Sequence, residues 1–581
     1  MYLAETRPSP TGRQAPSKAS SDRAPAQWHP DEAPAQWHRV LTLLANISLF
    51  IGTRALWTSA ASHRLLVAAV ISLCYASILV TGVLTLVVRR ARSLSRLDLV
   101  VLVTAVTLGV CGLIMSHHGS DESVLTTQAA HEFLAGHQVY GRPWPWLFGH
   151  GVALTTTMDG GYDYTYGYPP LPLMLTAPLL WIGHGQLAAT TVSTGSLIVS
   201  AIVMWRMLPV PWRSAATLVC LGLGLLPAYA RLGYPAIVAC ALLIPVVVGW
   251  PRLGRGGRGD LVRAVCLGAA CAAQQLPWFL TPFLLAGVYA LRRGEFGPRA
   301  AAFAVGRIVG VAAATWLAIN AYFIVTEPRS WISGIALPLT QKANIHGQGL
   351  VGISLYFTDG SDRLAWYSHA SLLLAAGLLG LFVLFVRRLG PAATVLPWCA
   401  FYVATRSQDG YYLMMTPLWL AAAVTAPWQS FTAAWQPRPA FLRGPHKRGA
   451  RVAAAALLLA PAATAVTLAV SGSPPLRMDV VGARRTSGAA VTELTVRVTN
   501  LGGAALSPHF TLTTGQGMSR YWTVAAGPAT LPGHGSASYR LLPPDGKFQL
   551  PKAGTRIRVR AVSASPMTLS SADVRLSALT P

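Results

Sequence analysis

The stretch that decides the fold is Leu65-Leu-Val-Ala-Ala-Val-Ile-Ser-Leu-Cys-Tyr-Ala-Ser-Ile-Leu-Val-Thr-Gly-Val-Leu-Thr-Leu-Val-Val88, which contains 24 residues and no charged side chain. An α-helix rises about 1.5 Å per residue, so this stretch can cross the roughly 30 Å hydrocarbon core of a bilayer. Runs of similar composition cover 97–115, 305–325 and 452–470. The sequence therefore predicts an α-helical domain that spans a membrane several times.

The composition of the rest of the chain supports this prediction. Hydrophobic residues make up 53% of the 581 residues and charged residues only 11%, whereas soluble domains carry about 25% charged residues. The mean hydropathy is +0.45. By the length criterion, the apolar segments correspond to roughly eleven to thirteen spans.

Basic residues cluster at the ends of the apolar runs and supply much of the net charge of +26. The clusters lie at 89–92, 252–263, 292–293, 387–388 and 443–451. This distribution follows the positive-inside rule and not the pattern of a nucleic-acid groove, so no nucleic-acid partner is expected. We predict a multi-pass protein of the plasma membrane with a cytoplasmic N-terminus and with outer loops at 116–168 and 327–369.

The sequence divides into three parts. Residues 1–40 are polar and rich in Pro, Ala and Ser, which predicts a disordered cytoplasmic tail. Residues 41–471 form the membrane domain. From 472 to 581 the sequence instead contains short runs in which apolar and polar residues alternate, such as Val491-Thr-Glu-Leu-Thr-Val-Arg-Val-Thr-Asn500. These runs predict a C-terminal extracytoplasmic domain with an immunoglobulin-like β-sandwich fold.

Two apolar segments do not fit a regular bundle. Between the first outer loop and Arg252 there are four segments where an odd number of crossings is required, and the Pro-rich segment 169–183 is the shortest. We expect it to be a re-entrant or interfacial helix. Segment 262–291 has basic flanks on both sides and is interrupted at Gln274-Gln-Leu-Pro277, which predicts a broken helix lining a cavity.

Acidic residues are concentrated in the outer loops, and the pair Asp121-Glu122 is the most informative of them. A solvated loop needs some charge, so solubility alone explains most of these residues. Asp121 and Glu122, however, follow a span by six residues, beside His117. Partial desolvation at the membrane surface raises the pKa of a carboxylate and suits it to base catalysis. Either residue of the pair can be the base.

The first outer loop is also rich in aromatic residues. The candidates for sugar or acceptor binding are Tyr140, Trp144, Tyr164, Tyr166 and Tyr168. Aromatic side chains at this density commonly form an interfacial belt, and flat rings also stack on sugar faces. Asp159 and Asp163 do not have the Asp-x-Asp spacing of nucleotide-sugar enzymes, and no P-loop follows a strand. No metal site and no cofactor is expected.

Several of these motifs together resemble the GT-C superfamily of membrane glycosyltransferases. The matching residues are Asp121 after an early span, Gly136 and Tyr140 in Gly-x-x-x-Tyr, and Tyr168-Pro169-Pro170 at the start of an apolar segment. The closest pattern is that of the polyprenyl-phosphate mannosyltransferase-like group, glycosyltransferase family 87. The chain has Gly233-Tyr234 where that group often has Gly-Gln, and Gln where it often has Lys before the broken-helix Pro.

The resemblance implies an inverting glycosyltransferase that uses a polyprenyl-phosphate sugar donor and acts on a cell-envelope glycan or glycolipid. Asp121 or Glu122 then deprotonates the acceptor hydroxyl. The departing phosphate needs cationic or hydrogen-bond donors where its charge develops. Candidates for that role are Arg406, Lys342, His346 and His117. Arg406 is the strongest, because the positive-inside rule disfavours an outward Arg that serves only as an anchor.

Two other functions are compatible with the sequence. The first is a transporter or flippase of a lipid-linked glycan, with the β domain as a binding module. A transporter is expected to show inverted repeats and ionisable groups at mid-membrane, and Asp98 is the only acidic residue in a span. The second is a protein without catalytic activity whose β domain anchors it to cell-wall glycan. Membrane lipid is an expected partner in every case.

Overall fold

The computed structural model describes residues 29–117, 119–148, 155–183, 185–440, 447–486, 490–515, 517–549 and 556–575. Most of the predicted tail, residues 1–28, lies outside these ranges. The first helix, α1, begins at Gln36, so the end of the segment that we assigned to the tail is part of a long helix.

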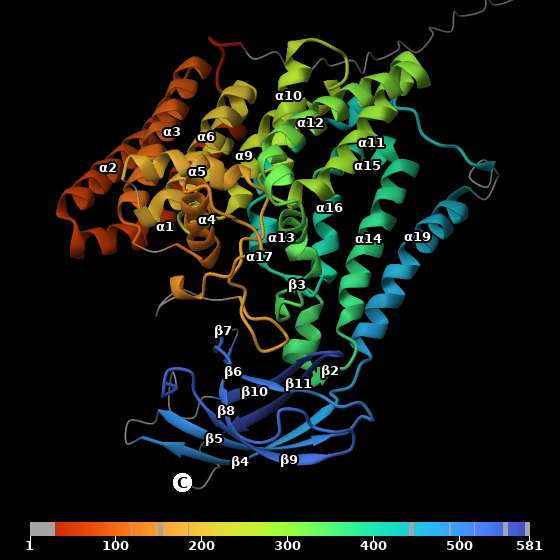
Figure 1. The fold of residues 1–581 in the computed structure, drawn as a ribbon. Coiled ribbons are helices and arrows are strands. Elements are labelled where there is room, and N and C mark those ends of the chain that lie inside the picture. Colours follow the sequence, from red (N-terminus) through yellow and green to blue (C-terminus); the bar gives the residue numbers. More distant parts are fainter. Residues whose placement is uncertain are drawn as a thin grey trace, which may run out of the picture.

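Within the described residues, seven helices are long and apolar enough to cross a membrane. They are α1 (Gln36–His63), α2 (Leu65–Val87), α3 (Ala91–Ile114), α6 (Ala188–Met207), α12 (Pro298–Thr326), α14 (Ala365–Leu384) and α19 (Lys447–Val470). An eighth span is counted if the bent pair α7 (Arg213–Leu221) and α8 (Leu225–Arg231) crosses as one unit. The chain is thus a membrane-embedded helical protein with fewer long helices than the eleven to thirteen predicted (Figure 1).

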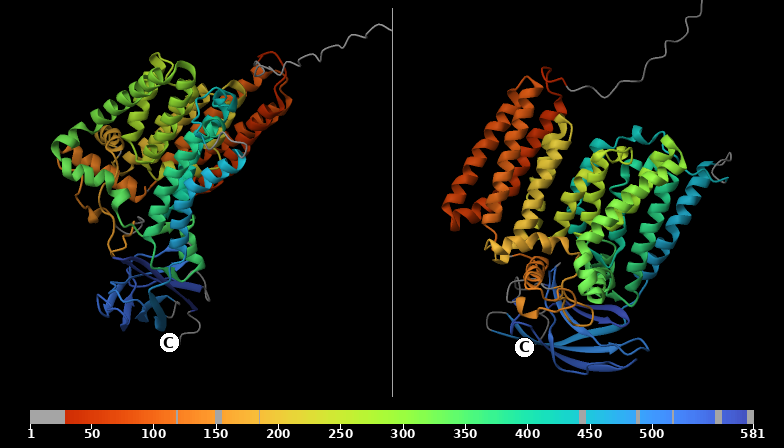
Figure 2. Two further views of the ribbon diagram at one scale, coloured as in Figure 1. Left: turned by 90° about the vertical axis from the view of Figure 1, so that its right-hand side faces the viewer. Right: turned by 45° about the horizontal axis from the view of Figure 1, so that its top comes forward.

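The remaining helices are shorter, except α11, which has 21 residues but is not among the candidate spans. They are α4 (Asp121–Leu134), α5 (Leu171–Trp181), α9 (Pro235–Val247), α10 (Arg258–Cys271), α11 (Leu276–Phe296), α13 (Pro328–Thr340), α15 (Val386–Leu389), α16 (Leu396–Cys399), α17 (Asp409–Leu413) and α18 (Thr416–Thr425). The predicted non-crossing segment forms α5, whose 11 residues extend only about 16 Å. Figure 2 shows α5 lying across the direction of the long helices.

The apolar segment 214–230, one of the four between the first outer loop and Arg252, is broken between α7 and α8. The break lies at Gly222–Gly224, where Leu223 and Gly224 have φ of 56° and 76° and the two helices bend by 50°. The backbone N–H of Leu223 donates to the carbonyl of Ser48 in α1. A Cβ on Gly52 would lie 2.3 Å from the backbone of Gly224, so only glycine at 52 allows this approach.

The predicted interruption at 274–277 is present as the break between α10 and α11. Gln274 Oε1 accepts a hydrogen bond from the N–H of Leu276, so it caps the first turn of α11. Gln275 Nε2 donates to the carbonyls of Gly167 and Ile335, each at 2.9 Å. The break is therefore tied to the aromatic loop and to α13, at the end of the bundle where the β domain lies.

The C-terminal part forms two antiparallel sheets. One has the order β4-β5-β9-β8 and the other β2-β11-β10-β6-β7. The strands are β2 (Gly360–Ser361), β4 (Leu476–Arg485), β5 (Val491–Asn500), β6 (His509–Thr514), β7 (Gly517–Met518), β8 (Thr523–Ala526), β9 (Ser536–Leu542), β10 (Arg556–Ala564) and β11 (Met567–Arg575). Buried side chains of both sheets, including Val496 and Val559, share one core. The two sheets thus pack face to face.

The strand β2 belongs to the membrane domain, because it lies in the loop before α14. It pairs with β11 in the register Leu569↔Ser361 and Ser570↔Gly360. Arg558 Nη1 donates to the carbonyls of Leu355 and Thr358 in the same loop. The β domain is therefore joined to the helical domain by a shared sheet as well as by the covalent link.

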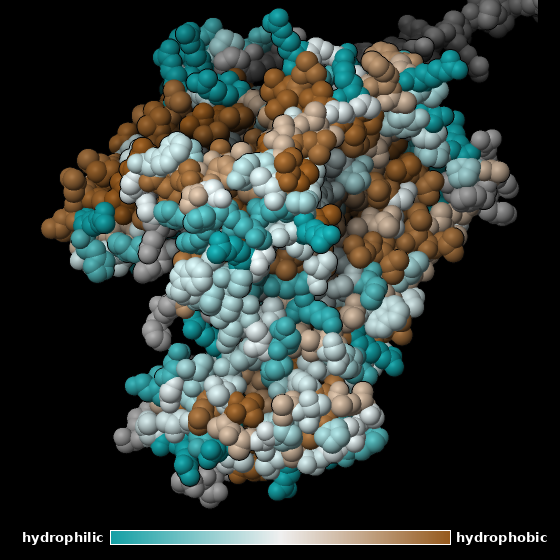
Figure 3. Space-filling view, viewed as in Figure 1, coloured by the Kyte–Doolittle hydropathy of each residue, from teal (hydrophilic) through white to brown (hydrophobic). Residues whose placement is uncertain are grey.

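The two ends of the molecule differ in surface character. The β domain and α4 lie at one end, and the start of α1 lies at the other (Figures 1 and 2). Apolar side chains gather on the helical part, whereas the β domain and the loops beside it are more polar (Figure 3). The polar end is where the residues predicted to carry the chemistry meet.

Candidate functional site

A cavity of about 250 Å³ lies at the end of the helical domain that faces the β domain. Its walls come from α4, α8, the α10–α11 break, α17 and the loop after α13. The lining residues are Glu122, Tyr229, Tyr234, Ala236, Gln274, His346, Gly347, Gln348, Tyr356, Gln408, Asp409, Gly410, Tyr411 and Met414. Most of these side chains can form hydrogen bonds, so the cavity suits a hydroxyl-rich or phosphorylated ligand.

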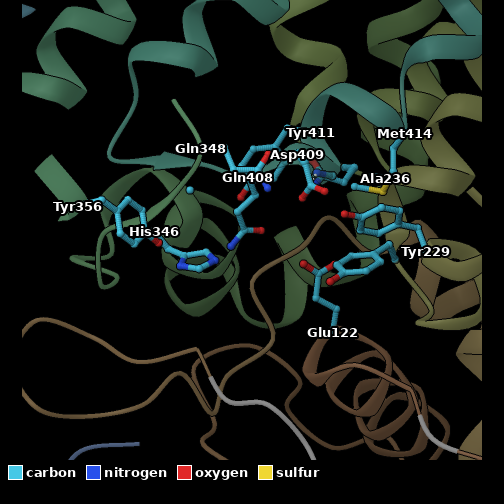
Figure 4. Close-up of a pocket in the computed structure, with 14 residues that line it drawn as sticks. Glu122, Tyr229, Ala236, His346, Gln348, Tyr356, Gln408, Asp409, Tyr411 and Met414 are labelled. Atoms are coloured by element: carbon cyan, nitrogen blue, oxygen red, sulfur yellow. Dashed lines mark hydrogen bonds between the residues drawn. The ribbon is translucent and has the colours of Figure 1, made fainter. Parts of the chain in front are cut away.

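Glu122 projects from the first turn of α4 into this cavity, as Figure 4 shows. Burial and the neighbouring carboxylate of Asp121 raise the pKa of Glu122 to about 8, although Tyr168 and Arg406 oppose the rise. A carboxylate with such a pKa holds its proton at neutral pH and is a stronger base once ionised. Glu122 is thus the carboxyl group in the cavity that is best suited to proton transfer.

Asp121, its neighbour, has a different role in the local structure. Its Oδ2 accepts a hydrogen bond from Thr155 at 2.9 Å, and its Oδ1 accepts from the N–H of Glu122 at 3.0 Å. Asp121 is not among the cavity-lining residues. Its negative charge at the N-terminus of α4 is favourable to the helix dipole. Asp121 therefore fixes the loop and the start of α4, and its charge acts on Glu122.

Arg406 lies close to both carboxylates. It is in β3 (Arg406–Ser407), which pairs in parallel with β1 (His346–Gly347), so that His346 is opposite Arg406. Burial lowers the pKa of Arg406, but Tyr411, Tyr168, Asp121 and Glu122 outweigh this effect and the net pKa is raised. Its buried Nε has no hydrogen-bond partner among the described residues. Arg406 itself is not among the residues that line the cavity, so it lies behind the wall that His346 forms.

The other three residues predicted to bind the phosphate lie in different parts of the structure. His346 lines the cavity, and burial together with Arg406 and Arg560 lowers its pKa, so it is neutral at pH 7. Lys342 donates to the Ala564 carbonyl and to Ser565 Oγ in the β domain. His117 is exposed and does not line the cavity. The structure thus brings Arg406 and His346 together with Glu122, whereas Lys342 belongs to the domain junction.

Of the five predicted aromatic residues, Tyr168 lies near the carboxyl pair, because its side chain opposes the rise in the pKa of Glu122 and both carboxylates raise the pKa of its own hydroxyl. Tyr140, Trp144 and Tyr166 are at most 1% exposed and belong to one apolar core. The hydroxyl groups of Tyr140 and Tyr166 donate to the carbonyls of Tyr168 and Pro169. Tyr164 packs at the edge of this core. This aromatic cluster therefore supports the Tyr168-Pro-Pro turn, with the rings of Tyr140, Trp144 and Tyr166 packed in the core and those of Tyr164 and Tyr168 partly exposed.

Several cavity residues were not selected from the sequence. They are Tyr229, Tyr234, Gln274, Gln348, Tyr356, Gln408, Asp409 and Tyr411. Of the segments that carry them, two stand out in the sequence, Gly233-Tyr234 and the helix break at 274–277. Tyr229 lies against the segment that carries Asp409, since a Cβ on Gly410 would be 3.2 Å from the Tyr229 ring. The signal that could have found these residues is the density of tyrosine and glutamine at the ends of apolar segments.

Comparison with known proteins gives no match: no family model, no curated protein and no solved structure matches the chain. Within the part of the chain that the structure describes, no three His, Cys, Asp or Glu side chains lie close enough together to hold a metal ion. The chemistry of the site therefore has to be inferred from Glu122, Arg406 and the polar lining of the cavity.

Proposed function

We propose that the chain is an inverting glycosyltransferase that takes a sugar from a polyprenyl-phosphate donor and transfers it to a cell-envelope glycan or glycolipid. The observation that carries this proposal is the position of Glu122, a cavity-lining carboxyl group of raised pKa, beside the Arg406 guanidinium. A base and a cation next to each other meet the two demands of transfer from a sugar phosphate, which are a deprotonated acceptor and a stabilised leaving group.

In the proposed reaction, ionised Glu122 accepts the proton of an acceptor hydroxyl. The acceptor oxygen forms a bond to the anomeric carbon of the sugar as the bond from that carbon to the phosphate oxygen breaks. Polyprenyl phosphate leaves with the electron pair, and Arg406 and the His346 ring stabilise its negative charge. A single displacement inverts the configuration at the anomeric carbon. Glu122 takes the role of the base because it lines the cavity, whereas Asp121 is held by Thr155.

The proposal includes an architecture and an orientation. The helical domain is GT-C-like, and the two C-terminal sheets are an immunoglobulin-like sandwich. The cavity end faces the extracytoplasmic side of the plasma membrane, and the N-terminus is cytoplasmic. The position of the cavity beside the polar β domain, at the end opposite the start of α1, supports this orientation (Figures 1 and 3).

The test is a transfer assay in membranes with a radiolabelled polyprenyl-phosphate sugar and three variants of α4. We expect Glu122→Gln to reduce transfer by about a hundredfold or more, the usual contribution of a general base. Asp121→Asn should reduce it only several-fold. Glu132→Gln, which changes a carboxylate on the same helix that pairs with His137 and Arg142, is the matched control and should leave transfer unchanged.

Two outcomes contradict this proposal in different ways. If Asp121→Asn abolishes transfer and Glu122→Gln does not, the base is Asp121. If the unmodified protein moves lipid-linked sugar across the membrane without transferring it, the chain is a transporter and the cavity is a binding site only.

A further inference from the structure

A second hollow lies between α1, α3 and α8, on the other side of α8 from the cavity. It has a volume of about 430 Å³ and follows α3 from Ala105 to its end at Ile114 and on to Ser116, a length of about 16 Å at the rise of a helix. Glycines form much of its floor, including Gly52 of α1 and Gly109 and Gly112 of α3. The hollow is therefore a groove lined largely by small residues, and it is long enough for a segment of hydrocarbon chain.

The mouth of this groove is suited to lipid. Ile51, Leu223 and Leu225 adjoin lining residues in the chain and are 60%, 53% and 50% exposed. All three lie on helices or breaks that are part of the candidate spans. Exposed apolar side chains on membrane-spanning segments face acyl chains and not water, so we infer that the surface beside the groove contacts the hydrocarbon of the bilayer.

Among the residues that the structure describes, Arg231 is the only charged one that lines the groove. Within the described part of the chain it forms no ion pair and no hydrogen bond. Its guanidinium lies against α3, where a Cβ on Gly112 would be 3.0 Å from Nη1. An unpaired cation beside a membrane span is costly and marks a functional site by default. A snorkelling Arg points away from the helices to the water, whereas Arg231 is packed onto the floor of the groove at Gly112.

The groove and the cavity are separate. The segment 229–234 divides them, because Tyr229 and Tyr234 line the cavity while Arg231 and Leu232 line the groove. No lining residue is shared between the two. The Leu232 carbonyl accepts hydrogen bonds from the N–H and the hydroxyl of Ser120, the N-cap of α4. A ligand bound at Arg231 therefore contacts the segment that holds the start of α4.

We propose that this groove binds one anionic phospholipid of the surrounding bilayer, with its phosphate on Arg231 and an acyl chain along α3. Charge complementarity selects this occupant. The lining carries one positive charge and no acidic residue, so a phosphate has a partner and the ammonium of a zwitterionic headgroup has none. Basic pockets between spans bind anionic headgroups in this way. The site does not depend on the proposed transfer reaction, whose donor phosphate lies beside Arg406.

The test is a lipid titration of the purified, delipidated full-length protein, with bound lipid counted by native mass spectrometry. The probe is phosphatidylglycerol, and the competitors are phosphatidylcholine with the same chains, inorganic phosphate and polyprenyl phosphate. We expect one tightly bound phosphatidylglycerol. Arg231→Gln should weaken binding about tenfold, the loss expected for one charged hydrogen-bond donor, and Arg231→Lys should weaken it less.

Two further variants separate the groove from general surface charge. Gly109→Leu fills the groove without changing the charge, since a Cβ there meets only Ile198 at 3.7 Å, and it should weaken binding as Arg231→Gln does. Arg329→Gln removes an exposed basic residue at the same end of the bundle and should leave binding unchanged. If Arg231→Gln fails to fold by thermal unfolding, Arg231→Lys and Gly109→Leu decide the test.

The proposal is overturned if phosphatidylglycerol binds these groove variants as tightly as it binds the unmodified protein, or if phosphatidylcholine binds equally well. Displacement by inorganic phosphate would show an anion site that needs no lipid chain. Displacement by polyprenyl phosphate at lower concentrations than phosphatidylglycerol would assign the groove to the lipid donor and would also overturn a separate phospholipid site.

Discussion

The cavity and the groove, which lie on the two sides of segment 229–234, differ in the polarity and charge of their lining side chains. The cavity is polar, and its charged groups have neighbours of opposite sign, such as Glu122 and Arg406. The groove is apolar and holds one cation without a partner, Arg231. Paired charges shift each other's pKa and serve proton transfer and charge stabilisation. A lone cation in an apolar groove is instead suited to bind an anion that carries a hydrocarbon chain, which is why we propose a phospholipid there.

The difference in lining between the two hollows indicates which of them is suited to catalysis. An Arg side chain lies near each hollow, Arg406 beside the cavity and Arg231 in the lining of the groove, so a basic residue alone does not distinguish them. Only the cavity adds a titratable carboxyl group and a set of tyrosine and glutamine side chains. We therefore place the transfer reaction in the cavity and lipid retention in the groove.

The largest effect should come from removing the cation of the cavity. We expect Arg406→Gln to reduce sugar transfer by about a hundredfold or more, because a positioned donor that stabilises leaving-group charge contributes on that order. Arg406→Lys should recover part of the loss, since it restores the charge but not the fork of donors. Arg231→Gln is the comparison. An equal loss of transfer at both positions would remove the functional distinction between the two hollows.

The pH dependence of the transfer rate should follow the ionisation of the Glu122 carboxyl group. Its raised pKa, about 8, means that the base is ionised only above that pH, so the rate of transfer should fall about tenfold per pH unit below it. The stability effect has the opposite sign. A carboxyl group whose pKa is raised on folding stabilises the protein fully below pH 4.5, and this contribution is lost as the pH rises through about 8.

Both pH effects should vanish in Glu122→Gln. The measurements are initial rates and thermal unfolding between pH 5 and 9, with the variant as the reference at each pH. A rate that is flat across this range, with a stability difference that does not change with pH, would show that Glu122 does not titrate in the cavity.

A smaller effect should separate the domain junction from the cavity. Gly360 has φ of 126°, and a Cβ there would lie 2.0 Å from the Leu569 carbonyl oxygen, in the β2–β11 pair. We expect Gly360→Val to prevent this pairing, to destabilise the protein by about 1–3 kcal/mol and to speed hydrogen exchange in β11. Gly546→Val is the control, because Gly546 also has positive φ but no atom within 4 Å of its Cβ position. Equal exchange in the two variants would mean that β2 does not hold the β domain.

Much of the fold could be predicted from the amino-acid composition and from the spacing of apolar residues along the sequence. The long apolar runs predicted helices such as α2 and α19, and the alternation at 491–500 predicted β5 with the observed ends. The break at 274–277 was visible because two polar residues and a proline interrupt an apolar segment. The break in 222–224 was not, since Gly-Leu-Gly is apolar and its bend depends on contact with Ser48 and Gly52 of α1.

The candidate site could be predicted only in part. Charge near a span end identified Asp121, Glu122 and Arg406, and the structure brings these three together. Which carboxylate faces the cavity depends on one turn of α4 and on the Thr155 hydrogen bond, and neither has a local sequence signal. Tyr140 and Trp144 show the limit of the aromatic pattern, because stacking on a sugar and packing in a core use the same residues.

The most direct test of the central claim, that the cavity is the site of transfer, is a cryo-electron microscopy structure of the full-length protein with a polyprenyl-phosphate sugar bound. We expect density for the sugar at Glu122 and for the phosphate beside Arg406, with the lipid chain leading from the cavity into the bilayer. Density for the donor phosphate at Arg231, with the cavity unoccupied, would contradict this claim and would place the substrate in the groove.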